Sequence, residues 1–142
     1  MSQDFLDFLK KREPKLCVLA TSSLDNQPAS AVMGYAVLDD LTVICSTDKS
    51  SRKWSNLMQN PKVALVFGWG FDELNIQYHG MATLVESGDE FKKCEETYFN
   101  FHPESLEFKG IPETGYIKIK PIWTRMSDYS SDPPLIQEES FN

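Results

Sequence analysis

The stretch that decides the fold is QPASAVMGYAVLDDLTVICSTDKSSRKWSNLMQNPKVALVFGWGFDELNIQYHG, residues 27–80. It begins with two apolar runs separated by Asp39 and Asp40, and a two-residue polar turn between such runs predicts an antiparallel hairpin. Further on, KVALVFGW predicts another strand, and LNIQYHG begins a longer one. Gly80 lies inside this longer strand, where a glycine often marks a bulge or a bend. The stretch therefore predicts consecutive antiparallel strands.

A short helix interrupts these strands in the segment SRKWSNLMQNP. Trp54, Leu57 and Met58 recur at helical spacing and form the stripe that we expect to be buried. Pro61 ends the helix, because the residue before a proline is driven out of the helical conformation. One small helix therefore connects two of the strands.

The flanking sequence adds two strands and two helices to this centre. Apolar periodicity predicts helices at 3–12 and 89–101. A buried strand is predicted at 16–23, and apolar and basic residues alternate in a strand at 115–126. About six strands joined by short turns, with only small helices, indicate a mainly β fold built as a closed or nearly closed antiparallel barrel.

The composition indicates a single domain. The chain has 142 residues, of which 41% are hydrophobic and 25% are charged, and we expect the folded domain to cover residues 1–129. The remaining segment, residues 130–142, has the sequence SSDPPLIQEESFN and is expected to be a flexible acidic tail.

Charge and motifs exclude several classes of function. A net charge of −7 and a pI near 4.8 argue against nucleic acids and membrane surfaces as partners. No apolar run approaches the roughly 20 residues that span a bilayer, and the first residues lack the pattern of a signal peptide, so we expect a cytoplasmic protein. The three cysteines show no CxxC spacing, and two isolated histidines do not predict a metal site.

A local exception to this acidic character is the cluster of Lys49, Arg52 and Lys53 at the expected start of the short helix. Cations in the first turn are each disfavoured by about 0.3–1 kcal/mol, because the helix dipole is positive there. A bound anion would reverse this penalty, and the hydroxyls of Thr47, Ser50 and Ser51 would add donors, which is typical of a phosphate site. The alternative is that these cations are solvated side chains on an exposed turn.

Residues 27–80 resemble the core of the pyridoxamine 5′-phosphate oxidase family, the FMN-binding split barrels. The resemblance rests on the motif SRK, followed by a leucine, by NPKVAL and by a terminal tryptophan, and on the spacing from Pro28 to Gly80. It implies a six-stranded antiparallel split β-barrel. It also implies a homodimer that holds two FMN molecules at the subunit interface.

The resemblance assigns roles to individual residues. It implies that Arg52 and Lys53 bind the FMN phosphate, with Ser51 near the helix cap, and that Thr47, beside Ser46, adds to this site. Residues on two other strands would contact the isoalloxazine ring or the ribityl chain of FMN: Val32, Met33, Gly34 and Asn75. No residue is predicted to act as the catalytic acid or base.

Two departures separate this chain from the oxidases of that family. The arginine and the lysine that help to hold cofactor and substrate in the oxidases correspond here to Ala31 and Ala36, and the C-terminal arginine-rich signature is absent. We therefore do not expect oxidation of pyridoxamine phosphate. The resemblance favours a small FMN-dependent oxidoreductase with another substrate and with NAD(P)H as the reductant.

Several alternatives remain open from the sequence. His79 shares a strand face with Asn75, so it can line the same pocket, be a haem ligand in a protein that binds haem or flavin without turnover, or only form a hydrogen bond. A deazaflavin would suit the phosphate site as well as FMN does. Loss of charge at Ala31 and Ala36 is also compatible with a cofactor-free interaction module. His102 is expected to cap a helix or to lie at the surface.

Overall fold

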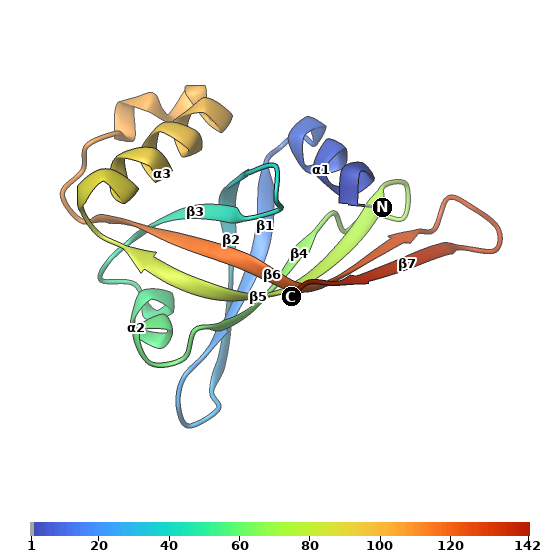
Figure 1. Cartoon of the computed structure of the whole chain (residues 1–142), viewed down its shortest axis with the longest axis horizontal. Coiled ribbons are helices and arrows are strands. Elements are labelled where there is room, and N and C mark those ends of the chain that lie inside the picture. The colour runs from blue at the N-terminus through green and yellow to red at the C-terminus, as the bar shows by residue number, and fades with distance from the viewer. Residues whose placement is uncertain (1) are drawn as a thin grey trace.

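The computed structural model describes residues 2–142, which form one antiparallel sheet with helices packed around it (Figure 1). The helices are α1 (Ser2–Lys11), α2 (Arg52–Gln59), α3 (Gly88–Phe101) and the short 3-10 helix η1 (Pro103–Phe108). The strands are β1 (Leu16–Ser22), β2 (Pro28–Val37), β3 (Val43–Asp48), β4 (Lys62–Phe67), β5 (Leu74–Val85), β6 (Thr114–Asp128) and β7 (Leu135–Ser140). Within the described residues, no helix combines the length and the hydropathy needed to cross a membrane.

Six of the strands close into a barrel. The strand order is β3-β2-β1-β4-β5-β6-β7, and β3 also pairs with β6. This closing ladder runs from Val43 opposite Ile119 to Asp48 opposite Thr114. The prediction of a six-stranded antiparallel barrel with flanking helices is therefore confirmed. Closure satisfies the backbone of strands that would otherwise be exposed edges of an open sheet.

The long hairpin of β5 and β6 is irregular at Gly80. The pairing of the two strands shifts between His79 and Gly80. A Cβ atom at Gly80 would lie 2.6 Å from Ile119 Cγ2 and 2.7 Å from the carbonyl oxygen of Lys120. Only a glycine allows this approach, so the predicted irregularity at the interior glycine is confirmed.

The core fills the barrel and continues onto α1. The apolar face of α1 contributes Phe5, Leu6 and Leu9, which are all buried. Tyr35 of β2 reaches the same region and donates a hydrogen bond from its hydroxyl to the carbonyl oxygen of Leu9 at 2.7 Å. The N-terminal helix is therefore part of the barrel core.

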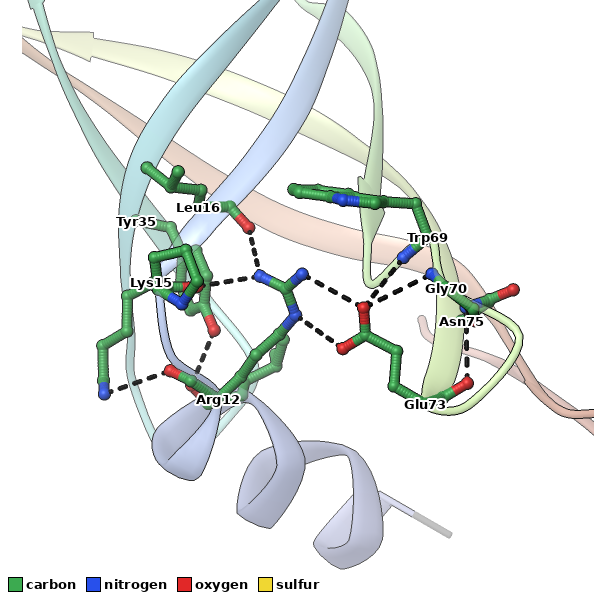
Figure 2. Close-up of polar contacts among 10 residues, drawn as sticks. Arg12, Lys15, Leu16, Tyr35, Trp69, Gly70, Glu73 and Asn75 are labelled. Carbon is green, nitrogen blue, oxygen red and sulfur yellow. Dashed lines mark hydrogen bonds and ion pairs between the residues drawn. The ribbon is translucent and has the colours of Figure 1, made fainter. Parts of the chain in front are cut away.

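Arg12 follows α1 and ties this helix to the loop between β4 and β5 (Figure 2). Its guanidinium donates to both carboxylate oxygens of Glu73, at 3.0 and 3.3 Å, and to the carbonyl oxygens of Pro14 and Leu16, at 2.8 and 3.1 Å. It also lies 4.5 Å from the centre of the Trp69 ring. Because Arg12 is buried, these contacts offset the cost of removing its charge from water.

The ordered chain continues past the expected end of the domain. Sequence analysis placed that end at residue 129, whereas residues 135–140 form β7 and pair with β6. Five of the six side chains of β7 are exposed, so no apolar alternation marks the strand. Backbone hydrogen bonds to β6 hold it instead, and the amide of Phe141 donates to the carbonyl oxygen of Ile122 at 2.9 Å.

The buried face of α2 differs from the predicted stripe at one position. Trp54 and Leu57 are buried as predicted, but Met58 is 71% exposed. Asn56 is buried in its place, and its Nδ2 donates to Thr21 Oγ1 at 3.1 Å. A polar side chain is tolerated there because β1 supplies its hydrogen-bond partner.

Candidate functional site

The turn between β3 and α2 builds the candidate site. Ser51 is the N-cap of α2, and its Oγ accepts a hydrogen bond from the amide of Trp54 at 3.3 Å. The amide and the hydroxyl of Ser50 both donate to Asp48 Oδ1, each at 2.7 Å, and these bonds lower the pKa of Asp48. The carboxylate of this turn is therefore engaged by Ser50, and the first turn of α2 contains no acidic residue.

Thr47, Ser51 and Lys53 converge at this turn. Thr47 Oγ1 lies 3.3 Å from Ser51 Oγ, and Lys53 Nζ donates to Thr47 Oγ1 at 3.4 Å. Thr47 is positioned by its pairing with Gly115 in the closing ladder of the barrel. Two hydroxyls and an ammonium are groups that can donate to the oxygens of an anion.

None of the cations of this region forms an ion pair within the described chain, although the charges of Lys49 and Lys53 contribute to the lowered pKa of Asp48. The ion pairs among residues 2–142 involve other basic side chains, and none includes Lys49, Arg52 or Lys53. The chain has 21 acidic and 14 basic residues, so carboxylates are abundant. Three neighbouring cations that still lack an ion pair favour an anion site over a turn of merely solvated side chains.

A cavity of about 280 Å³ opens beside these cations. Arg52 and Lys53 line one side, and the remaining lining residues belong to the β1–β2 hairpin: Leu19, Thr21, Ala29, Ser30 and Ala31. Thr21 and Ser30 were not predicted as site residues, because only the folding of this hairpin beside α2 brings them there. The hydrogen bond from Asn56 to Thr21 fixes that arrangement.

The β2 residues that were predicted to follow the flavin ring have different surroundings. Val32 is exposed on the outer face of the barrel, whereas the side chain of Met33 is buried in the core. Gly34 lies beneath α3, where a Cβ atom would be 2.5 Å from Tyr98 Oη. Alternation along the strand produces these differences. Neither Met33 nor Gly34 therefore presents a side chain to a ligand.

Asn75 and Ser46 lie outside the cavity beside the cations. The Nδ2 of Asn75 donates to the carbonyl oxygens of Gly70 and Glu73, at 3.0 and 3.4 Å, and so holds the β4–β5 loop (Figure 2). Ser46 and Thr47 line another cavity, of about 300 Å³, against α3 and η1. Within one chain, the structure therefore brings together only part of the predicted site: Thr47, Ser51, Arg52 and Lys53.

The two histidines occupy separate environments. His79 is exposed on β5, with its ring centre 4.7 Å from that of Trp123, and it lines an outward cavity of about 460 Å³ instead of the cavity at α2. His102 forms the C-cap of α3, as expected, but it is buried instead of exposed. Its Nε2 lies 2.7 Å from the carbonyl oxygen of Tyr35, and its ring stacks on Tyr98.

The fold and the site together define a closed antiparallel barrel with a candidate anion site at the start of a helix. The sequence profile described as pyridoxamine 5′-phosphate oxidase matches residues 1–128. The chain therefore belongs to the pyridoxamine 5′-phosphate oxidase family. A curated relative, the pyridoxine/pyridoxamine 5′-phosphate oxidase of Anaplasma marginale, is 33% identical over 78 residues, which are 55% of this chain and 36% of that relative.

Solved structures share this fold at low sequence identity. A pyridoxamine 5′-phosphate oxidase-related, FMN-binding protein from Nostoc punctiforme has a TM-score of 0.73 at 15% identity and covers 99% of this chain and 95% of its own. A heme binding protein from Mycobacterium smegmatis has a TM-score of 0.73 at 12% identity, over 89% of this chain and 52% of its own. These similarities establish the split-barrel fold.

Proposed function

We propose that this chain binds FMN and acts as a small flavin-dependent oxidoreductase. The observation that carries the proposal is the convergence of Thr47, Ser51 and Lys53 beside Arg52, where neither cation forms an ion pair within residues 2–142. A phosphate monoester supplies the negative charge and the acceptor oxygens that this arrangement lacks. Membership of the family supports FMN as the source of that phosphate.

Each residue of the site has its own part in holding a phosphate. Lys53 and Arg52 supply positive charge. Ser51 Oγ accepts from the amide of Trp54, and Thr47 Oγ1 accepts from Lys53. Because one of these two hydroxyls donates to the other, one hydroxyl hydrogen remains for a phosphate oxygen. The amides in the first turn of α2 add further donors.

The proposal includes a homodimer. Val18 of β1 lies between Val32 of β2 and Val66 of β4, and Val32 and Val66 are 62% and 37% exposed. This row of valines is an apolar surface on the outside of the barrel, which a second copy would bury. The cavity at α2 is small for a whole FMN, so the flavin ring would lie between the two copies.

A bound flavin supplies hydride or electron transfer, and the chain supplies its anchorage and orientation. NAD(P)H is the proposed reductant. Oxidation of pyridoxamine phosphate is not part of the proposal. Ala36 is fully buried against α3 beside Cys94 and Tyr116, so there is no room for a lysine, and Ala31 adds no charge to the cavity.

Titration of the purified chain with FMN, followed by flavin fluorescence, tests the proposal. We expect saturation near one FMN per chain. Arg52→Ala and Lys53→Ala should each weaken binding by about 1.5–3 kcal/mol, the scale of a charge-assisted hydrogen bond, with the exposed Arg52 at the lower end. Lys92→Ala, which removes an exposed cation from α3, is the matched control and should bind FMN as the parent does.

Titration with riboflavin distinguishes the contribution of the phosphate to binding from that of the flavin ring. Riboflavin carries the same isoalloxazine and ribityl groups without a phosphate. The variants Arg52→Ala and Lys53→Ala should therefore bind riboflavin with the same affinity as the parent chain does. If the double variant binds FMN as tightly as the parent chain does, the assignment of the phosphate site is refuted.

A second candidate function is binding of haem or flavin without turnover. The observation that favours it is His79, exposed beside Trp123 on a cavity whose other walls include Ala20, Ala64 and Ile122. An imidazole above an apolar cavity is a potential haem-iron ligand. Titration with hemin should then shift the Soret band, and His79→Ala should abolish the shift. Consumption of NADH or NADPH by the FMN-loaded chain would favour the oxidoreductase instead.

A further inference from the structure

A second region of the molecule has the features of a small-molecule site. A cavity of about 680 Å³ lies between α1, the β4–β5 loop and the β6–β7 hairpin. None of its lining residues lines the cavity at the start of α2. Its volume falls within the range of roughly 300–1,000 Å³ that small-molecule sites occupy, and nothing in the proposed flavin site makes use of it.

The floor of this cavity is apolar. Phe8 of α1, Leu74 at the start of β5 and Met126 of β6 line it together with Leu135 of β7. Leu135 is 59% exposed, although β7 pairs with β6 along its whole length. An exposed leucine on an ordered strand beside three apolar neighbours provides a surface against which an aromatic or alkyl group can pack.

Charged residues surround this floor, and some of them neutralise one another. Arg12 forms an ion pair with Glu73, and Lys15 forms one with Glu13. The charged groups on the cavity that remain outside these pairs are three carboxylates and one ammonium: Asp4, Asp7, Asp128 and Lys11. The rim therefore has an excess of negative charge above an apolar floor.

Two of these carboxylates come from different elements, and each has an oxygen that can still accept a hydrogen bond from a ligand. Asp7 of α1 accepts from Gln3 through Oδ1 at 2.9 Å. Asp128 of β6 accepts from the amide and the hydroxyl of Ser130, also through Oδ1, at 3.0 and 2.5 Å. The bonds formed within the described chain use one oxygen of each carboxylate. The second oxygen of each remains available to accept from a cation.

One wall of the cavity is held rigidly. Figure 2 shows the Arg12 guanidinium between Glu73 and the carbonyl oxygen of Leu16. The guanidinium also donates to the carbonyl oxygen of Pro14. Glu73 also accepts from the amides of the loop at Trp69 and Gly70. The separation between α1 and the β4–β5 loop is therefore set before a ligand arrives, which lowers the cost of binding.

We propose that this cavity binds a small amphipathic cation, an amine carried on an aromatic or short alkyl body. The body lies on the floor formed by Phe8, Leu74 and Leu135, and the ammonium lies between Asp7 and Asp128. Charge complementarity selects the cation, because an anion of the same size would meet uncompensated carboxylates. The proposal stands apart from the flavin function and does not depend on it.

Isothermal titration calorimetry with phenethylamine tests the charge requirement. Phenethyl alcohol has the same ring and chain without the positive charge. We expect saturable binding of the amine at one site per chain, with a dissociation constant on the order of 1 mM for so small a probe. The alcohol should bind about fivefold more weakly. Equal affinities, or the absence of saturable amine binding, overturn the proposal.

Three variants locate the binding. Asp7→Asn combined with Asp128→Asn should weaken amine binding by about fivefold to tenfold and leave alcohol binding unchanged. Leu135→Ser, at an exposed position that does not threaten folding, should weaken both ligands. Glu107→Gln removes an exposed charge from η1, and amine binding should not change. Parental affinity in the Asp7/Asp128 double variant overturns the proposal. FMN binding should be unaffected by all of these changes.

Discussion

The Glu73→Gln substitution tests how α1 is held to the barrel. It keeps the shape of the side chain and removes the charge that faces the Arg12 guanidinium at 3.0 and 3.3 Å. The Arg12 side chain is only 6% exposed, so its charge would remain buried without the carboxylate partner. Its bonds to the carbonyl oxygens of Pro14 and Leu16 would persist.

The structure sets the size of the expected effect. Breaking a fully buried ion pair costs about 3–5 kcal/mol, and a hydrogen bond to a charged group contributes about 1.5–3 kcal/mol. Glu73 is 28% exposed, so water screens part of the interaction, and Arg12 keeps its other partners. We therefore expect the free energy of unfolding to fall by about 2 kcal/mol, which lowers Tm by roughly 6 °C.

The effect should depend on pH in a defined direction. The hydrogen bond from Arg12 is the main cause that lowers the pKa of Glu73 below its ordinary value of 4.5. A carboxyl group with a lowered pKa contributes its full stabilisation above the ordinary pKa, and the contribution is lost as pH falls through the lowered pKa. The difference between parent and variant should therefore be constant near neutral pH and shrink as pH falls below 4.5.

Urea unfolding of the parent and of Glu73→Gln, Arg12→Met and the double variant, at about pH 7 and about pH 3, measures this effect. The double-mutant cycle should give a coupling of about 1.5 kcal/mol at the higher pH. Glu107→Gln, which removes an exposed charge that forms no ion pair among residues 2–142, is the control. A loss that is equal at both pH values, or a coupling below about 0.5 kcal/mol, would refute the reasoning.

Three further substitutions test the barrel and the site. Gly80→Ala should lower the free energy of unfolding by about 1–3 kcal/mol in urea, because its Cβ would lie 2.7 Å from a backbone oxygen of β6. No loss would show that the hairpin can relax there. Ser51→Ala should cost about 0.5–2 kcal/mol by thermal unfolding, through loss of the N-cap. Ser51→Asp should keep the cap but weaken FMN binding by about tenfold, since it adds a carboxylate to the anion site. Unchanged FMN affinity in Ser51→Asp would contradict that site.

Local patterns were enough to predict the barrel strands and the helix start. Apolar runs bounded by turn residues mark the six strands, and apolar and basic residues alternate in the strand at 115–126. The arrangement of groups at the candidate anion site was predictable for a similar reason. Thr47, Ser51 and Lys53 lie within seven consecutive residues, so the turn and the helix that follow from the sequence also bring these groups together.

Strand β7 and the burial of His102 were not predictable in this way. Almost all side chains of β7 are exposed, and its order comes from pairing with β6, a contact that has no signature in its own residues. His102 is buried because α3 carries it onto β2, where its ring reaches the carbonyl oxygen of Tyr35. Both outcomes depend on where a distant strand lies.

The sequence by itself determined the six barrel strands, their turns and the cationic start of α2, because these depend on residues that are neighbours in the chain. Only the tertiary structure decided which walls complete the sites. The β1–β2 hairpin brings Thr21 and Ser30 to α2, and the packing of α1 on the barrel places Asp7 of α1 and Asp128 of β6 around one cavity. The physical reason is that the pairing of distant strands depends on apolar burial and backbone hydrogen bonds summed over the whole barrel. The sequence of a single segment does not contain this information.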